Sequence, residues 1–334
     1  MAVVGIPGSL LYYRFFPLWE AFFGGLGVNI KTSKPSSNIT LLNGANYAHS
    51  DSCLPIKLGF GHVAELMGDA DYIFLPRFFR LEEKSFVCPK MIGFTDMIKS
   101  VLCSADSGQG VNCQANPACT GVSKKKIAGV KNTEFIEPLF DIHNYSNQKV
   151  FKKIGSFFSW NPFKIRRAYF DSVRHYNNVC NERENIFLKK LNLNRGLKIG
   201  VIGHPYNIYD EFISMGILKE LSKLDVLPVT FEDAPGIGFE CDFSKFPSNL
   251  FWSFGREIYK TAQYFMNGED FKVDGIIYVA PFGCGLDSIM TTIVQGAAKD
   301  AGVPFLSLVV DEHTAKAGIV TRLEAFIDMI AYKK

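Results

Sequence analysis

The feature that most constrains the fold is a regular alternation of short apolar runs with helix-type patterns, in two blocks of the chain. Asp71–Pro76 is the clearest strand of the first block, and Val273–Ala280 is the clearest strand of the second. The second of these is followed by a helical pattern over Asp287–Ala301. Strands that alternate with helices favour parallel β-structure in doubly wound sheets. We therefore predict an α/β protein with two Rossmann-like doubly wound domains.

The pattern predicts the following elements in chain order. In the first block we expect strands over 2–6, 28–32 and 71–76, and helices over 10–26, 53–67 and 89–101. A charged pattern over 163–191 indicates one or two connecting helices. In the second block we expect strands over 197–203, 226–231, 273–280 and 304–310, and helices over 210–224, 250–266, 287–301 and 315–331.

The length of 334 residues is too great for one compact core of the usual size, so two domains are expected. We place the first α/β domain at 1–145, with Cys53 and Cys88, and the second at 196–334, with Cys284. Residues 146–195 are expected to form a helical connector between them.

Composition excludes several classes of protein. The net charge of +3 is too small to indicate nucleic-acid binding. No run of eighteen apolar residues is present, so we expect no membrane span. The first seven residues have no basic region before their apolar stretch and indicate a strand instead of a signal peptide. We therefore expect a cytoplasmic protein with reduced thiols.

Three of the eight cysteines share one setting. Cys53, Cys88 and Cys284 each stand in a loop that leads into a helical pattern. A helix N-terminus offers unpaired N–H groups and partial positive charge, which lower the pKa of a thiol and stabilise an anionic cluster. Gly283 and Gly285 beside Cys284 would let a bulky group approach the backbone. Three thiols on a four-iron cube would leave one iron free for chemistry.

Each of these thiols taken alone could be a small buried hydrophobic side chain, but the three together favour a cluster. No Cys-x-x-Cys pair is present, which disfavours zinc ribbons and ferredoxin-type sites. The ligands must therefore converge through the fold, and we place the cluster in the crevice between the two domains.

The other cysteines are less informative. Cys103, Cys113 and Cys119 lie in a segment of loop composition and could extend the metal site or be incidental thiols. Cys180 falls among helical residues and is expected to be structural, and Cys241 receives no role.

Few residues indicate acid–base chemistry. His204 follows a predicted strand and could face the crevice, although a single His is more often structural. Glu312 and His313 open the last helix and are candidates for acid–base work near the cluster, whereas Thr314 is expected to cap that helix. Arg322 could hold an anionic substrate or pair with a neighbouring carboxylate.

Nucleotide motifs are absent or misplaced. Gly59–Ala64 resembles a dinucleotide fingerprint but lies inside a helical pattern, so it is interpreted as a chance match. No Gly-x-x-x-x-Gly-Lys-Ser/Thr motif is present, so hydrolysis of ATP by a P-loop is not expected.

These residues together resemble the activase-related family of 2-hydroxyacyl-CoA dehydratase proteins, over nearly the whole chain. The matching stretches are Gly5–Pro7, Leu11–Trp19, Cys53–Lys57, Gly61–His62, Asp71–Arg77, Cys88–Lys90, Gly203–Asn207, Phe282–Gly285, Asp287–Ser288, Asp311–Thr314, Ala317–Gly318 and Thr321–Phe326.

The resemblance implies a cofactor and a partner. Related dehydratase and benzoyl-CoA reductase subunits carry a [4Fe–4S] cluster on three cysteines between α/β domains, and Cys53, Cys88 and Cys284 occupy the matching positions. A separate ATP-hydrolysing activator of the actin/hexokinase-like fold reduces that cluster. Some related proteins carry an [8Fe–9S] double-cubane cluster. The segment with Cys103, Cys113 and Cys119 departs from the family pattern, and six cysteines would suffice for the larger cluster.

The sequence therefore leaves several functions open. The chain is expected to accept low-potential electrons from the activator and to use or relay them at an open iron. An acyl-CoA or another small molecule is the implied substrate, and a homodimer or a pair with a homologous subunit is the expected assembly. The alternatives are a non-catalytic cluster-binding subunit, a double-cubane reductase of small molecules, and a thiol or zinc protein without iron.

Overall fold

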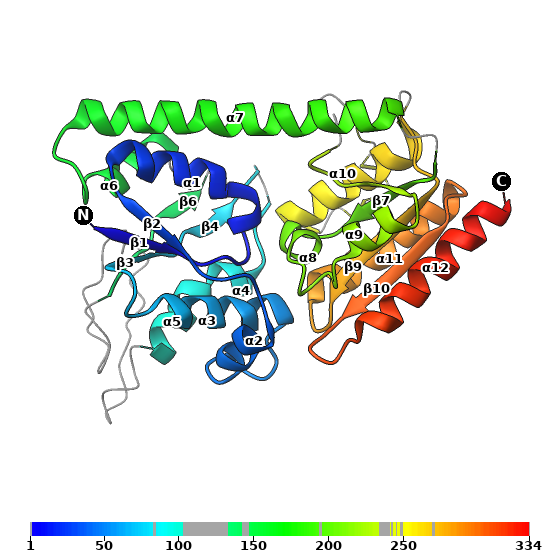
Figure 1. Cartoon of the computed structure of the whole chain (residues 1–334), viewed down its shortest axis with the longest axis horizontal. Helices are drawn as coiled ribbons and strands as arrows, with labels where there is room; N and C mark the ends of the chain where they lie inside the picture. The colour runs from blue at the N-terminus through cyan, green and yellow to red at the C-terminus, as the bar shows by residue number, and fades with distance from the viewer. Residues whose placement is uncertain are drawn as a thin grey trace. The chain divides into compact units, whose positions relative to one another are not determined.

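A computed structural model gives the fold of the chain (Figure 1). It describes residues 2–82, 85–102, 133–141, 147–193, 196–233, 241, 243–244, 246–247, 250–268 and 271–333. The chain divides into two compact units, one of Met1–Ser52 and Ile56–Asn177 and the other of Cys53–Pro55 and Asn178–Lys334. The predicted domain boundaries at residues 145 and 195 stay predictions.

The first unit is built on a four-stranded parallel sheet in the order β2-β1-β3-β5. Its strands are β1 (Val3–Ile6), β2 (Asn29–Thr32), β3 (Tyr72–Phe74) and β5 (Glu134–Ile136). A separate parallel pair is formed by β4 (Arg77–Arg80) and β6 (Leu139–Asp141).

The helices of the first unit are α1 (Tyr12–Leu26), α2 (Asn38–Ala45), α3 (Leu54–Leu66), α4 (Pro89–Ile92), α5 (Phe94–Leu102), α6 (Asn147–Gly155) and the first part of α7 (Pro162–Leu193). Large aromatic side chains of α1 and α6 are buried in the core. Phe22 of α1 meets Phe151 of α6 edge to face, with ring centroids 4.7 Å apart, and Phe23 meets Phe74 of β3 in the same way at 5.3 Å. These edge-to-face pairs are the arrangement that aromatic rings favour in a core.

The second unit repeats the strand arrangement of the first. Its four strands are all parallel, in the order β10-β9-β7-β8. They are β7 (Lys198–Ile202), β8 (Leu227–Val229), β9 (Gly275–Pro281) and β10 (Phe305–Val310). Every residue of β9 is buried, as expected for a central parallel strand that is covered on both faces.

Helices α8 (Pro205–Tyr209), α9 (Ile217–Lys223), α10 (Ser253–Asn267), α11 (Gly285–Asp300) and α12 (Lys316–Lys333) surround this sheet. Figure 1 shows α12 alongside β10 and β9. A Cβ on Gly275 of β9 would lie 2.6 Å from Ile330 of α12, and a Cβ on Gly200 of β7 would lie 2.5 Å from Phe265 of α10. Both helices therefore pack directly on strand backbone. The mixed α/β class with parallel sheets is confirmed.

Two predicted helices are wrong in part. The expected helix over 210–224 begins only at Ile217, because Met215 and Gly216 have positive φ values of 54° and 70°. The expected helix over 89–101 is two helices, α4 and α5, which meet at Gly93. Within the described ranges, none of the helices is long and apolar enough to cross a membrane.

Candidate functional site

Each four-stranded sheet has one position where a ligand site is expected. In the first sheet, β2 pairs with one edge of β1 and β3 pairs with the other edge. In the second sheet, β8 and β9 flank β7 in the same way. The strand order therefore reverses between β1 and β3 and between β7 and β9, and these positions are the switch points. Ligands of open α/β sheets bind beyond the carboxyl ends of the strands at such points. In the second unit, His204 follows β7 and Cys284 follows β9.

A buried carboxylate lies at the switch point of the second unit. Asp287, in the first turn of α11, is fully buried. Its oxygens lie 3.0 and 3.1 Å from Nδ1 of His204, and they accept hydrogen bonds from the Tyr278 hydroxyl at 2.7 Å and from Nδ2 of Asn207 at 3.2 Å. The four side chains come from β9, α8, α11 and the loop after β7, so the sheet and two helices together fix this network.

The network holds Asp287 in its charged form. Burial alone favours the neutral acid, but the charge and hydrogen bond of His204, with the hydrogen bond from Tyr278, outweigh burial and lower the pKa of Asp287. Burial and the charge of Asp287 raise the pKa of Tyr278 well above its ordinary value, so this phenol stays a hydrogen-bond donor.

Cys284 is the N-cap of α11, and its sulfur accepts a hydrogen bond from the backbone N–H of Asp287 at 3.5 Å. Gly283 before it has a φ of +74°, a conformation that favours glycine. A Cβ on Gly283 or on Gly285 would meet no atom within 4 Å, so there is open space beside the sulfur-bearing loop. Burial first, and then the charge of Asp287, raise the pKa of the Cys284 thiol.

Two buried polar atoms of this network have no hydrogen-bond partner among the described residues. They are Nε2 of His204 and Oδ1 of Asn207, both on side chains that are almost completely buried. His204 also stacks on the ring of Tyr206, with centroids 5.0 Å apart. A buried group without a partner is costly, so these two atoms indicate a place for a water molecule or a ligand.

The other two predicted cluster ligands also stand directly before helices. Cys53 precedes α3, and Cys88 is the N-cap of α4; both are partly exposed. Cys53 belongs by its contacts to the same unit as Cys284, and its charge contributes to the raised pKa of Cys284. Within the described part of the chain, no three His, Cys, Asp or Glu side chains are grouped to hold a metal ion.

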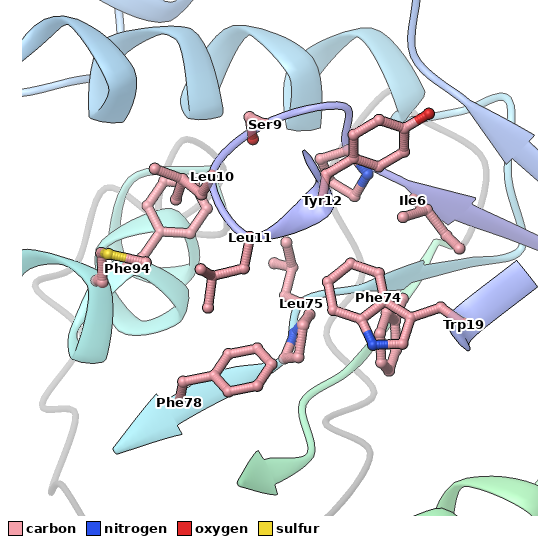
Figure 2. Close-up of a pocket in the computed structure, with 13 residues that line it drawn as sticks. Ile6, Ser9, Leu10, Leu11, Tyr12, Trp19, Phe74, Leu75, Phe78 and Phe94 are labelled. Atoms are coloured by element: carbon pink, nitrogen blue, oxygen red, sulfur yellow. The ribbon is translucent and has the colours of Figure 1, made fainter. Parts of the chain in front are cut away.

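An apolar pocket lies at the switch point of the first unit, where β1 and β3 end (Figure 2). Its cavity volume is about 50 Å³, which is room for a small group only. Figure 2 shows the rings of Trp19, Phe74 and Phe78 around the side chain of Leu11. Met91, three residues after Cys88, also lines the pocket. The pocket could therefore receive an apolar group next to the Cys88 loop.

The remaining candidates from the sequence are exposed side chains or lie outside the described residues. Glu312 and His313 are exposed, and so is Arg322 on α12. Thr314 and Asp311 bond to each other in the loop before α12: Oγ1 of Thr314 accepts the backbone N–H of Asp311 at 2.8 Å. The expected cap of α12 by Thr314 stays a prediction. Cys103, Cys113 and Cys119 lie outside the described residues. Cys180 is exposed on α7.

Sequence reasoning missed the residues that hold His204. Asp287, Tyr278 and Asn207 were not predicted as site residues, although Asp287 and Asn207 lie in the stretches that carry the family resemblance. A usable signal was the pair of polar side chains in the middle of β9 and in the first turn of α11, because polar groups in an otherwise apolar setting need partners.

Comparison with known families identifies the chain. Residues 3–234 match the family described as "CoA enzyme activase uncharacterised domain (DUF2229)". The chain belongs to this family. Residues 260–330 of this activase-domain protein match a second family, "2-hydroxyglutaryl-CoA dehydratase, D-component". That match includes β9, Cys284 and Asp287. The resemblance predicted from the sequence motifs is confirmed.

Comparisons with individual proteins add little. No curated protein matches the chain. Among solved structures, a Zn(II)-bound variant of AdcAII from Streptococcus pneumoniae is 11% identical, with 99% of this chain and 98% of that chain covered. Its TM-score of 0.24 is too low to carry an argument about the fold or the site.

Proposed function

We propose that this activase-domain protein is an iron–sulfur component of the 2-hydroxyacyl-CoA dehydratase type, with Cys53, Cys88 and Cys284 as cluster ligands. The observation that carries the proposal is that all three thiols stand directly before the first residue of a helix, and that Cys284 lies in the stretch matching the dehydratase D-component. That family is linked to iron–sulfur clusters.

The residues around Cys284 fit such a group. Thiolates are the usual protein ligands of iron–sulfur clusters. The pKa of the buried Cys284 thiol is raised, so its thiolate needs a nearby cation, which iron supplies. The open space beside Gly283 and Gly285 leaves room for a bulky group at the sulfur. The N–H of Asp287 that donates to the Cys284 sulfur is the kind of hydrogen bond that tunes a cluster.

The cluster would supply one-electron chemistry and, at an iron without a protein ligand, a site for a substrate oxygen. The chain's own residues then have distinct tasks. Asp287 holds His204 by Nδ1, which leaves Nε2 to make a hydrogen bond with a bound molecule. Tyr278 and Asn207 fix the Asp287 carboxylate, and through it the first turn of α11.

The two matching families imply an ATP-dependent activator as partner. We propose that this activator, of the actin/hexokinase-like fold, delivers low-potential electrons to the cluster in the cytoplasm, and that the chain works as a homodimer or with a homologous subunit. The substrate class is an acyl-CoA or another small molecule, and the choice between a [4Fe–4S] and an [8Fe–9S] cluster depends on Cys103, Cys113 and Cys119.

An EPR experiment separates a catalyst from an electron relay. The protein is prepared without oxygen and reduced, and spectra are recorded with and without a panel of acyl-CoA thioesters. A ligand that binds an open iron should change the signal, and the His204→Gln variant should alter that change while keeping its iron. A reduced signal that no thioester affects would contradict the open iron and favour a relay or a cluster-binding subunit.

A further inference from the structure

One surface of the first unit exposes large aromatic side chains at a corner of the chain. This corner consists of α6, the turn between α6 and α7, and the start of α7. Trp160 is 100% exposed, Phe163 is 81% exposed, and Phe157 and Phe170 are 44% and 45% exposed. Exposed aromatic side chains that lie together mark interaction sites more often than single exposed ones do.

The same corner is strongly basic. From residue 146 to residue 170 the chain has six basic residues and no acidic residue, although the whole chain carries a net charge of only +3. Lys149, Lys152 and Lys153 are exposed on α6, and Arg166 and Arg167 are exposed on the first turns of α7. We call these five basic residues and the four aromatic residues the aromatic–basic corner.

The corner is a fixed structure. Oδ1 of Asn161 accepts hydrogen bonds from the backbone N–H groups of Phe163 and Lys164 at 3.0 and 3.2 Å, which starts α7. Phe158 turns inward and meets Phe23 and Tyr72 edge to face, with centroids 5.8 and 5.5 Å apart. The turn therefore holds Trp160 outward in a defined position.

The apolar face of α6 is buried in the core of the first unit. Val150, Phe151 and Ile154 are buried, so this helix presents only its lysines outward. The aromatic side chains of the corner are consequently the apolar groups that a partner can contact here, and the lysines and arginines flank them on two helices.

We propose that the aromatic–basic corner binds the surface of an anionic lipid bilayer. Trp and other aromatic rings favour the head-group level of a bilayer, and clusters of Lys and Arg favour anionic head groups. Aromatic side chains and Arg are common at both kinds of interface, but Lys is depleted at protein–protein interfaces, so the three lysines among the five basic residues favour a bilayer over a protein partner. This inference does not depend on the proposed cluster.

The test uses the full chain and two kinds of vesicle. One is phosphatidylcholine alone, and the other is phosphatidylcholine with phosphatidylserine in equal parts. We expect sedimentation with the second kind only, and release at high salt because the attraction is screened. Emission of Trp160, which is fully exposed in the free protein, should move to shorter wavelength on binding, and the Trp160→Phe variant should lose that change.

Variants separate the aromatic and basic contributions. Trp160→Ser with Phe163→Ser should weaken binding about tenfold or more, because the anchoring rings are lost. Lys152→Gln with Lys153→Gln should weaken it about thirtyfold, from about 1 kcal/mol for each basic residue near the surface. The matched controls are Tyr332→Ser, which replaces a side chain 95% exposed on α12, and Lys299→Gln with Lys333→Gln; both should bind as the unchanged protein does.

Two results would overturn the proposal. One is the absence of vesicle binding at low salt, or binding that the Trp160 and Phe163 changes leave intact, which would indicate charge attraction alone. The other is tighter binding to polyglutamate than to anionic vesicles, with the same dependence on Trp160. That result would assign the corner to an acidic protein instead of a bilayer.

Discussion

Replacement of Asp287 by Asn tests the network at the switch point of the second unit. The substitution keeps the shape of the side chain but removes the charge that faces His204, and both side chains are buried, at 0% and 1% exposure. Removal of one partner from a buried charge pair costs about 3–5 kcal/mol. Tyr278 donates to Oδ1 and Asn207 donates to Oδ2, so the single amide oxygen can keep only one of these two hydrogen bonds, and we expect a loss inside that range instead of below it.

The assay is urea unfolding combined with hydrogen exchange of the β9 amides, which reports on the second unit. Asp171→Asn is the matched control, because Asp171 is half exposed and should change stability by less than about 0.5 kcal/mol. In the Asp287→Asn, His204→Gln double variant, the loss should be smaller than the sum of the single losses by about 1–3 kcal/mol. A loss below about 1 kcal/mol for Asp287→Asn, or additive losses in the double variant, would refute the reasoning.

Two further predictions concern backbone conformation and pH. Gly203→Ala should destabilise the second unit by about 1–3 kcal/mol in urea unfolding, because φ is +150° and the new Cβ would lie 2.6 Å from the Val279 carbonyl oxygen. The control is Gly296→Ala, where the new Cβ would meet no atom within 4 Å, and it should be neutral or stabilising in the same assay. Burial lowers the pKa of His62 to about 4 from an ordinary 6.5. The neutral His62 therefore contributes fully to the free energy of unfolding above pH 6.5, and this contribution, roughly 3 kcal/mol, is lost as the pH falls toward 4. His62→Gln should flatten this pH dependence and the exposed His175→Gln should not; an unchanged profile in His62→Gln would contradict the assignment.

Central strands of the fold could be predicted from sequence because their burial leaves a continuous apolar run. All seven residues of β9 are buried, and the run over 273–280 indicated the strand directly. The strands β4, β5 and β6 were missed, because each offers only two consecutive apolar residues next to a charged one, which is not a distinctive pattern. The error over 210–216 had local causes: in addition to the positive φ values of Met215 and Gly216, Oδ1 of Asp210 accepts the N–H groups of Phe212 and Ile213 in a turn that competes with a helix.

The candidate site was only partly accessible to sequence reasoning. Placement of Cys284 before a helix followed from the strand-loop-helix pattern, and the structure has α11 begin at the next residue. The contact between His204 and Asp287 joins residues 83 positions apart. No local pattern predicts such a contact, because it depends on the neighbouring positions of β7 and β9 in the sheet.

Iron and acid-labile sulfide counts on the protein prepared without oxygen test the central claim most directly. The account predicts that the unchanged chain binds both elements in the ratio of a cluster, and that Cys53→Ala, Cys88→Ala and Cys284→Ala each lose most of them. Cys180→Ala, which removes an exposed thiol on α7, should keep them. Full iron in Cys284→Ala, or zinc instead of iron in the unchanged chain, would contradict the account.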